Sequence, residues 1–262
     1  MITNDPLKAK ILSDNGVDRI FVDLEILGKQ KRQGHLDTVI SKHKISDVAK
    51  IKKTISQGEV LVRINPLNNN SQSEIEKVID NGADIIMLPM FTDLHEIEQA
   101  ALYINNRAKF IPLIETKKAA ENILKIAESS EVDEFYIGLN DLHLDYQLKF
   151  MFQLLQNGTL EKITKALKQK NFNFGFGGIS RIGHGLLPSE NILTEHNRLG
   201  STSAILSRSF CKMNEITDDF IFTEVTKIKN FVNSLSNRNE IDIVRDKTEL
   251  DKKIKNVIRG LV

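Results

Sequence analysis

Two acidic residues stand where short apolar runs end in the middle of the chain. Glu115 directly follows Leu113-Ile114, and Asp141 comes shortly after Phe135-Tyr136-Ile137. Neighbouring parallel strands lie about 5 Å apart, so carboxylates at matching strand ends can reach one point. Carboxylate oxygens suit Mg²⁺ or Mn²⁺, whereas zinc favours histidine or cysteine ligands. The sequence therefore predicts a Mg²⁺ or Mn²⁺ site formed by Glu115 and Asp141.

Other polar residues also stand at the ends of apolar runs, namely Asp23, Glu25, Arg63, Asn65, Asn140, Ser207 and Arg208. Acids buried together with an arginine are costly unless a function uses them. A metal held by two carboxylates keeps open positions that a 2-oxo acid can fill. We expect Arg63 to hold the developing oxyanion, because its guanidinium is planar and permanently charged. Asn140 is a further substrate-binding candidate, and Glu25 a catalytic one.

Seven short apolar runs predict buried strands over residues 20–25, 60–65, 85–89, 110–114, 135–138, 172–176 and 204–206. Helical stretches separate most of them, for example over 73–79, 117–130 and 144–157. Strand and helix alternate, which favours a parallel sheet with right-handed crossovers. Residues 1–4 can add an eighth strand before a helix over 6–14. We therefore predict an α/β fold, a (β/α)8 TIM barrel, although an open doubly wound sheet also fits the pattern.

No low-complexity linker interrupts the chain, so residues 1–262 are expected to form a single barrel domain. Apolar residues at helical spacing over 216–235 and 248–261 predict a C-terminal helical extension of about 214–262. This is more helix than one βα unit needs. The extension is expected to make a homo-oligomer contact, or else to pack on its own barrel.

Charge and composition exclude several classes of protein. Lys and Arg number 36 against 35 Asp and Glu, so no strong overall field favours nucleic acid or an anionic membrane. No run of about 18 apolar residues could span a membrane, and the first residues do not form a targeting signal. Cys211 is the only cysteine, which fits a reducing compartment. We expect a cytoplasmic protein without nucleic-acid or membrane partners.

Two further kinds of chemistry have little support in the sequence. A Schiff-base mechanism needs a buried lysine, and none of the seven predicted strands carries one. The glycine-rich segment 175–181 lies where barrels often bind phosphate, but it is neither a Walker loop nor a dinucleotide fingerprint. Tight backbone packing explains its glycines equally well, so metal-assisted chemistry is preferred.

Five sequence strings resemble the citrate lyase β-subunit and metal-dependent 2-oxo acid aldolase family. They span residues 16–25, 62–65, 82–90, 114–116 and 137–142, within a likeness over about 16–210. The resemblance implies a phosphoenolpyruvate/pyruvate-type barrel that uses Mg²⁺ or Mn²⁺. It places the metal ligands on Glu115 and Asp141 and the substrate arginine on Arg63. The implied function is a metal-dependent carbon–carbon lyase or aldolase acting on a pyruvate-like 2-oxo acid through an enolate.

The sequence departs from this family at the residue after Glu25. Aldolases of the group carry a histidine there and citrate lyase-like members an aspartate, but this chain has Ile26. The alternatives are therefore a citrate lyase β-subunit-like acyl-CoA lyase and a non-catalytic ligand-binding barrel of the same family.

A replacement for the missing base can come from the segment that follows Ile26. His35 and His43 are the candidates, and His43 is preferred because Ser41 and Asp47 stand near enough in sequence to orient it. Arg32 and Arg181 are expected to bind substrate, as clamps for an acidic or phosphorylated acceptor.

Overall fold

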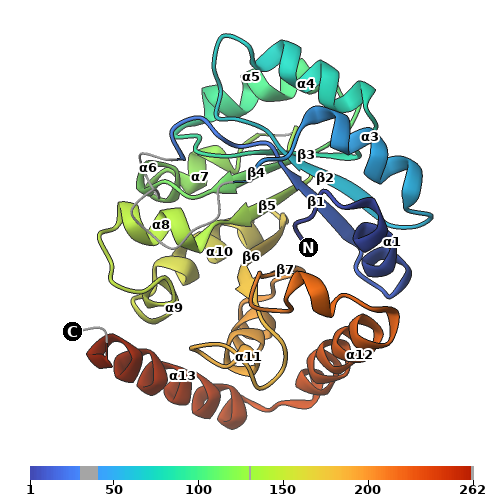
Figure 1. Ribbon diagram of the computed structural model, residues 1–262. Helices are drawn as coiled ribbons and strands as arrows, with labels where there is room; N and C mark the ends of the chain where they lie inside the picture. Colours follow the sequence, from blue (N-terminus) through green and yellow to red (C-terminus); the bar gives the residue numbers. More distant parts are fainter. Residues whose placement is uncertain (30–40, 130, 261–262) are drawn as a thin grey trace.

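The computed structural model describes residues 1–29, 41–129 and 131–260. Seven strands form one parallel sheet in the order β1-β2-β3-β4-β5-β6-β7, and the sheet curls so that helices cover its outer face (Figure 1). The strands are β1 (Arg19–Asp23), β2 (Glu59–Arg63), β3 (Ile85–Leu88), β4 (Lys109–Ile114), β5 (Glu134–Ile137), β6 (Asn173–Ile179) and β7 (Ser203–Leu206). All seven overlap the strands predicted from sequence.

The helices connect the strands and extend the chain beyond β7. Those up to β7 are α1 (Pro6–Asp14), α3 (Ile45–Thr54), α4 (Ser71–Asp80), α5 (Leu94–Ile104), α6 (Lys117–Glu121), α7 (Ile123–Ile126), α8 (Leu139–Asp145), α9 (Gln153–Gln156), α10 (Thr159–Gln169) and α11 (Ser189–Leu199). The 3₁₀ turn η1 (Met213–Glu215), α12 (Asp218–Ser234), the 3₁₀ turn η2 (Leu235–Asn237) and α13 (Glu240–Gly260) follow.

Residues alternate between the two faces of the curled sheet, as strand geometry requires. The outward-facing residues join the main core against the helices. The inward-facing residues form a second, smaller cluster of Phe21, Leu61, Ile85, Met87, Ile111, Leu113 and Tyr136. Polar groups lie at the two ends of this inner cluster. At the amino ends of the strands Arg19 pairs with Glu134 at 2.8 Å, and Lys109 pairs with Glu59 at 2.6 Å.

The predicted eighth strand is present only as a short bridge. Ile2 pairs in parallel with Phe21, whose N–H donates to the carbonyl of Met1 at 2.9 Å. Over the described residues the sheet is therefore a curled, seven-stranded half-barrel, and the full eight-stranded barrel expected from sequence is not confirmed. The physical reason is local: Asp5 already caps α1 by accepting the N–H groups of Leu7 and Lys8, which leaves little extended chain before the helix.

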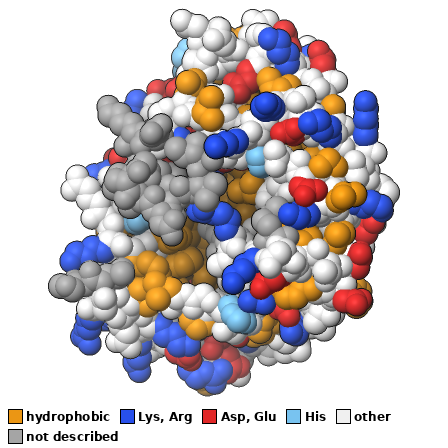
Figure 2. All heavy atoms as spheres, in the orientation of Figure 1, with side chains coloured by type: hydrophobic (Ala, Val, Ile, Leu, Met, Phe, Trp, Pro, Cys, Tyr) orange, Lys and Arg blue, Asp and Glu red, His pale blue; other side chains and the backbone are white. Residues whose placement is uncertain are grey.

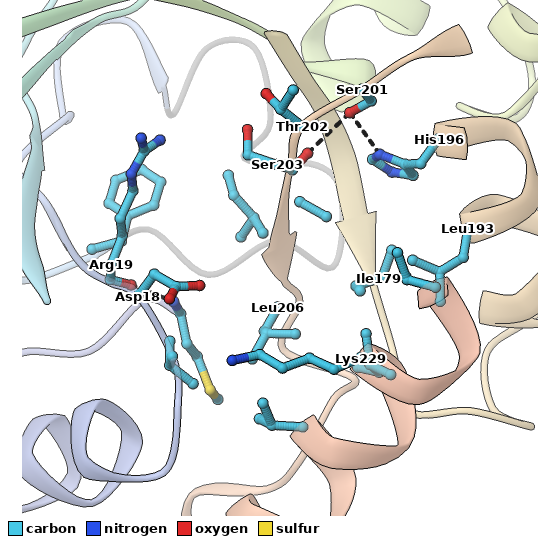
Figure 3. A pocket seen from close by; sticks show the side chains of 18 of the residues that line it. Asp18, Arg19, Ile179, Leu193, His196, Ser201, Thr202, Ser203, Leu206 and Lys229 are labelled. Carbon is cyan, nitrogen blue, oxygen red and sulfur yellow. Dashed lines mark hydrogen bonds between the residues drawn. The ribbon is translucent and has the colours of Figure 1, made fainter. Parts of the chain in front are cut away.

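A cavity of about 480 Å³ opens at the seam between β1 and β7. Apolar side chains from inside the curl, among them Phe21, Leu61 and Met87, form part of its wall. Figure 2 shows a hollow near the middle of this face with hydrophobic side chains inside it. Figure 3 shows Lys229 reaching across the cavity from α12. No residue predicted to carry the chemistry lines this cavity, so we place the candidate site elsewhere.

The predicted helix over 144–157 is wrong. The chain forms α8 and α9 instead, and the residues between them turn, with Gln147 in the left-handed region at φ 55°. Apolar spacing alone could not reveal this interruption, because Leu148 and Met151 still pack against the core.

The C-terminal extension packs on the chain itself. Leu250 and Ile254 of α13 are buried, and α13 contacts α9 and α11. Lys253 donates to Asn191 of α11 at 2.9 Å, and Gln156 of α9 donates to the carbonyl of Asp251. The structure thus favours packing on its own barrel as the role of these helices, and the oligomer contact stays a prediction. Among the described helices, none is long and apolar enough to cross a membrane.

Candidate active site at the carboxyl ends of the strands

Asp23 and Arg63 form the centre of the candidate site. They are register partners at the carboxyl ends of β1 and β2. Arg63 donates from Nε to Oδ1 of Asp23 and from Nη2 to Oδ2, both at 2.9 Å. This fork-to-fork geometry holds the guanidinium in one orientation and leaves Nη1 without an acceptor among the described residues. The predicted substrate arginine is therefore fixed with unused donors.

A second cation, Lys29, lies in the same cluster. Its side chain is only 5% exposed, and Nζ donates to Oδ2 of Asp23 at 2.8 Å and lies 3.3 Å from Oε2 of Glu25. Nη2 of Arg63 lies 3.4 Å from the same Glu25 oxygen. Lys29 was not predicted from sequence, because it lies outside the predicted strands, six positions after the last residue of β1. Its only sequence signal is the spacing of four from Glu25.

The electrostatics of the cluster favour its charged forms. Burial alone would raise the pKa of Asp23, but Arg63 and Lys29 lower that pKa to about 2. Burial alone would lower the pKa of Arg63, but Asp23, Glu25 and Glu115 raise it above its usual range. The Arg63 charge therefore interacts with Glu115 as well as with the two acids of the β1 end. The three acids and the arginine share one electrostatic site.

Asn65 fixes the backbone that follows Glu25. Its Oδ1 accepts the N–H groups of Ile26 and Leu27, both at 3.0 Å, and its Nδ2 donates to Glu74 of α4 at 2.8 Å. Glu25 is fully buried, while Ile26 is 58% exposed. The residue that replaces the family histidine thus faces solvent.

Glu115 follows β4, and its buried carboxylate lies between the backbone of Met90 and that of Gly138. Its Oε1 accepts the N–H of Met90 at 3.1 Å, and Met90 adopts a left-handed conformation with φ 58°. Such backbone strain in a residue other than glycine often marks a functional site. On the other side, a Cβ at Gly138 would lie 2.9 Å from Oε2 of Glu115. Gly138 therefore leaves the space that the carboxylate occupies. Neither contact could be predicted from residue type alone.

Asn140 and Asp141 lie in the first turn of α8, so the expected strand end at this position is a helix start. The N–H of Gly138 donates to the carbonyl of Ile114 at 2.9 Å, which places this turn beside the end of β4. Asp141 is 7% exposed, and Asn140 is half-buried. No group of three or more His, Cys, Asp and Glu that could hold a metal occurs in the described parts of the chain. Buried oxygen donors at Glu115 and Asp141 fit Mg²⁺ or Mn²⁺ with most coordination positions left open.

His43 lies beside the same cluster. Its Nδ1 accepts the backbone N–H of Asp23 at 3.0 Å. Burial lowers the pKa of His43, more than the nearby Asp23 and Asp47 raise it, so the neutral ring is favoured. With Nδ1 accepting, the neutral ring carries its proton on Nε2 and offers a donor there. His43 can accept a proton at Nδ1 only after the bond to Asp23 is released.

Of the remaining predicted site residues, Arg181 is described by the structure, whereas Arg32 and His35 are not. Arg181 follows β6, and its guanidinium carbon lies 5.5 Å from the centre of the Phe220 ring of α12. Its Nε is buried without a hydrogen-bond partner within the described residues. Arg32 and His35 lie outside the described residues. The structure thus brings together Asp23, Glu25, Arg63 and His43, and no direct contact joins Arg181 to them.

The sequence matches the profile of a known family over residues 2–173, described as HpcH/HpaI aldolase/citrate lyase. The chain belongs to this family. The resemblance inferred from the five sequence strings is confirmed. Members of the HpcH/HpaI family are typically metal-dependent lyases. No curated protein sequence matches the chain.

Several solved structures share the fold of this chain. An HpcH/HpaI aldolase from Desulfitobacterium hafniense is 15% identical with a TM-score of 0.62, covering 91% of each chain. The citrate synthase SbnG is also 15% identical, with a TM-score of 0.61 over 91% of this chain and 94% of that one. A citrate lyase beta subunit from M. tuberculosis, complexed with oxaloacetate and magnesium, is 14% identical with a TM-score of 0.58, covering 84% of this chain and 94% of its own. Identities this low show the fold alone.

Proposed function

We propose that this member of the HpcH/HpaI family is a divalent-metal-dependent lyase that makes or breaks a carbon–carbon bond next to a 2-oxo acid. The observation that carries the proposal is the buried carboxylate of Glu115, held between the Met90 N–H and Gly138 and within the electrostatic reach of Arg63. The citrate lyase beta subunit crystallised with oxaloacetate and magnesium supports the same class of ligand and metal.

Glu115 and Asp141 would hold Mg²⁺ or Mn²⁺. When bound, the ion would polarise the 2-oxo group and stabilise negative charge on its oxygen. Arg63 contributes from the protein side, because its Nη1 donors are uncommitted and its orientation is fixed by Asp23. Asn140 adds an amide at the start of α8. Arg63 and Asn140 would thus offer N–H donors to the incoming 2-oxo acid.

The proton-transfer step is assigned to His43. Its ring is anchored to the backbone of Asp23 and neutral near pH 7, so it is close to the cluster and in the form that a base needs. Accepting a proton at Nδ1 requires release of the Asp23 N–H. Substrate binding at the β1 end would supply the movement.

Metal binding tests the proposal first. Mn²⁺ should raise the melting temperature of the wild type by mass action. Asp141→Asn should remove most of this rise, whereas Asp145→Asn on the same helix should keep it, because Asp145 is exposed and caps α6 through the N–H of Lys117. Equal Mn²⁺ stabilisation of the wild type and Asp141→Asn would remove Asp141 from the site.

Carbon–carbon chemistry tests the proposal second. The Mn²⁺-loaded protein is incubated with 4-hydroxy-2-oxo acids, and released pyruvate is measured with lactate dehydrogenase. We expect metal-dependent release that Arg63→Lys strongly reduces. The runner-up function is a non-catalytic ligand-binding barrel, and it is favoured by one observation, the exposed Ile26 where the family has its histidine. Metal binding without any release of pyruvate would favour that alternative.

A further inference from the structure

Among the described residues, Lys29 is the buried cation of the candidate site that the family resemblance does not assign. Its ammonium lies against Asp23 and Glu25, the same two carboxylates that Arg63 contacts. Two cations and two carboxylates therefore alternate in one buried cluster. Within this group the formal charges cancel.

Burying Lys29 for structure alone is an expensive arrangement. Arg63 already pairs with Asp23 through two hydrogen bonds, so the carboxylate whose charge Lys29 balances in the cluster is Glu25. Moving an ammonium out of water costs several kcal/mol, and a buried ion pair often does not recover that cost. A buried ammonium at the carboxyl ends of the strands is therefore better explained by a ligand that uses it.

The unused donors of Lys29 and Arg63 indicate what that ligand is. An ammonium has three N–H donors, and within the described residues Asp23 accepts only one hydrogen bond from Lys29. Nη1 of Arg63 has no acceptor there either. Because Nζ and Nη2 both lie within 3.4 Å of the same Glu25 oxygen, the two cations are close neighbours. Adjacent cations with free donors are suited to an oxyanion such as a carboxylate.

We propose that Lys29 is a substrate-binding residue, which donates to the carboxylate of the 2-oxo acid beside Arg63. This inference rests on the proposed function and adds to it a second cationic contact for the substrate. Lys29 comes from the segment after β1 that carries Ile26 instead of histidine, so this segment supplies an ionic group to the cluster. It acts on the anion and makes no bond to the metal.

Removing the charge of Lys29 should change the affinities for Mn²⁺ and for oxalate in opposite directions. Lys29→Gln removes one positive charge from the cluster, so Mn²⁺ affinity should rise severalfold, because like charges repel. The same change removes a donor for the anion, so the affinity of the Mn²⁺-saturated protein for oxalate should fall by on the order of tenfold. Oxalate is the probe because its planar carboxylates resemble the enolate of a 2-oxo acid. A purely structural lysine would not move the two affinities in opposite directions.

The Mn²⁺ and oxalate affinities are measured by titration calorimetry, and two further variants complete the experiment. Lys29→Arg keeps the charge and donors and should retain most of the oxalate affinity. Lys109→Gln removes a charge at the opposite end of the barrel, where Lys109 pairs with Glu59, and should change neither affinity. The proposal is overturned if Lys29→Gln binds oxalate like the wild type, or if it loses Mn²⁺ and oxalate together while Lys29→Arg does the same. If the wild type binds neither probe, the proposed function itself fails and Lys29 loses its role with it.

Discussion

Arg63 and Asp23 are paired twice, once by strand register and once by the two 2.9 Å hydrogen bonds between their side chains. The backbone ladder sets the distance between β1 and β2, and the side chains then meet at the carboxyl ends of both strands. The orientation of the arginine is therefore determined by the sheet, before any ligand binds. Such preorganisation is what lets a charged group stabilise a developing oxyanion.

Replacing Arg63 with lysine should separate activity from stability. The lysine keeps the charge but loses the planar fork, so pyruvate release should fall by about a hundredfold or more. The free energy of unfolding should fall by only about 2 kcal/mol, since one charged hydrogen bond is lost. Arg19→Lys is the matched control, because Arg19 pairs with Glu134 at the amino end of the barrel. A comparable loss of activity in both variants would contradict the assigned role of Arg63.

Gly138 is expected to control the position of Glu115. A Cβ at this residue would lie 2.9 Å from Oε2 and 3.0 Å from Cβ of Glu115, so Gly138→Ala must displace the carboxylate. Mn²⁺ affinity, measured by titration calorimetry, should fall by about tenfold or more. Gly260→Ala places a methyl group in open space at the end of α13 and should leave the affinity unchanged. Full Mn²⁺ affinity in Gly138→Ala would show that Glu115 does not need its present position.

His43 should make stability depend on pH. Its pKa is lowered in the folded state by burial, so the unfolded chain takes up a proton at higher pH than the folded one. The contribution of His43 is therefore complete above the ordinary pKa of 6.5 and is lost as the pH falls below that value. His43→Gln should flatten the melting temperature over this range, while His95→Gln, at an exposed position on α5, should not. A wild-type slope retained in His43→Gln would place the titrating group elsewhere.

The sequence was informative wherever residue type and spacing repeat along the chain. Seven apolar runs predicted seven strands, and Glu115 and Arg63 were placed at strand ends because each directly follows or ends such a run. The family was evident from the strings around those same residues. Parallel strands with short connections leave few alternatives for where such residues lie.

Contacts made outside the repeating pattern could not be predicted. Lys29 folds back from the chain after β1, and no periodicity links it to Asp23 in sequence. Met90 contributes a backbone N–H, so its side chain gives no signal of the role. Asp141 was expected at a strand end, but the chain turns at Gly138 and starts α8 first. These departures depend on backbone conformation, which residue type constrains only weakly.

Proton exchange at the methyl group of pyruvate tests the proposed enolate chemistry most directly. Purified protein is incubated with pyruvate in deuterated water with and without Mn²⁺, and loss of the methyl signal is followed by proton NMR. We predict Mn²⁺-dependent exchange in the wild type, none above background in Glu115→Gln or Asp141→Asn, and wild-type exchange in Asp145→Asn. Mn²⁺ bound to the wild type without any methyl exchange would contradict the proposed enolate chemistry.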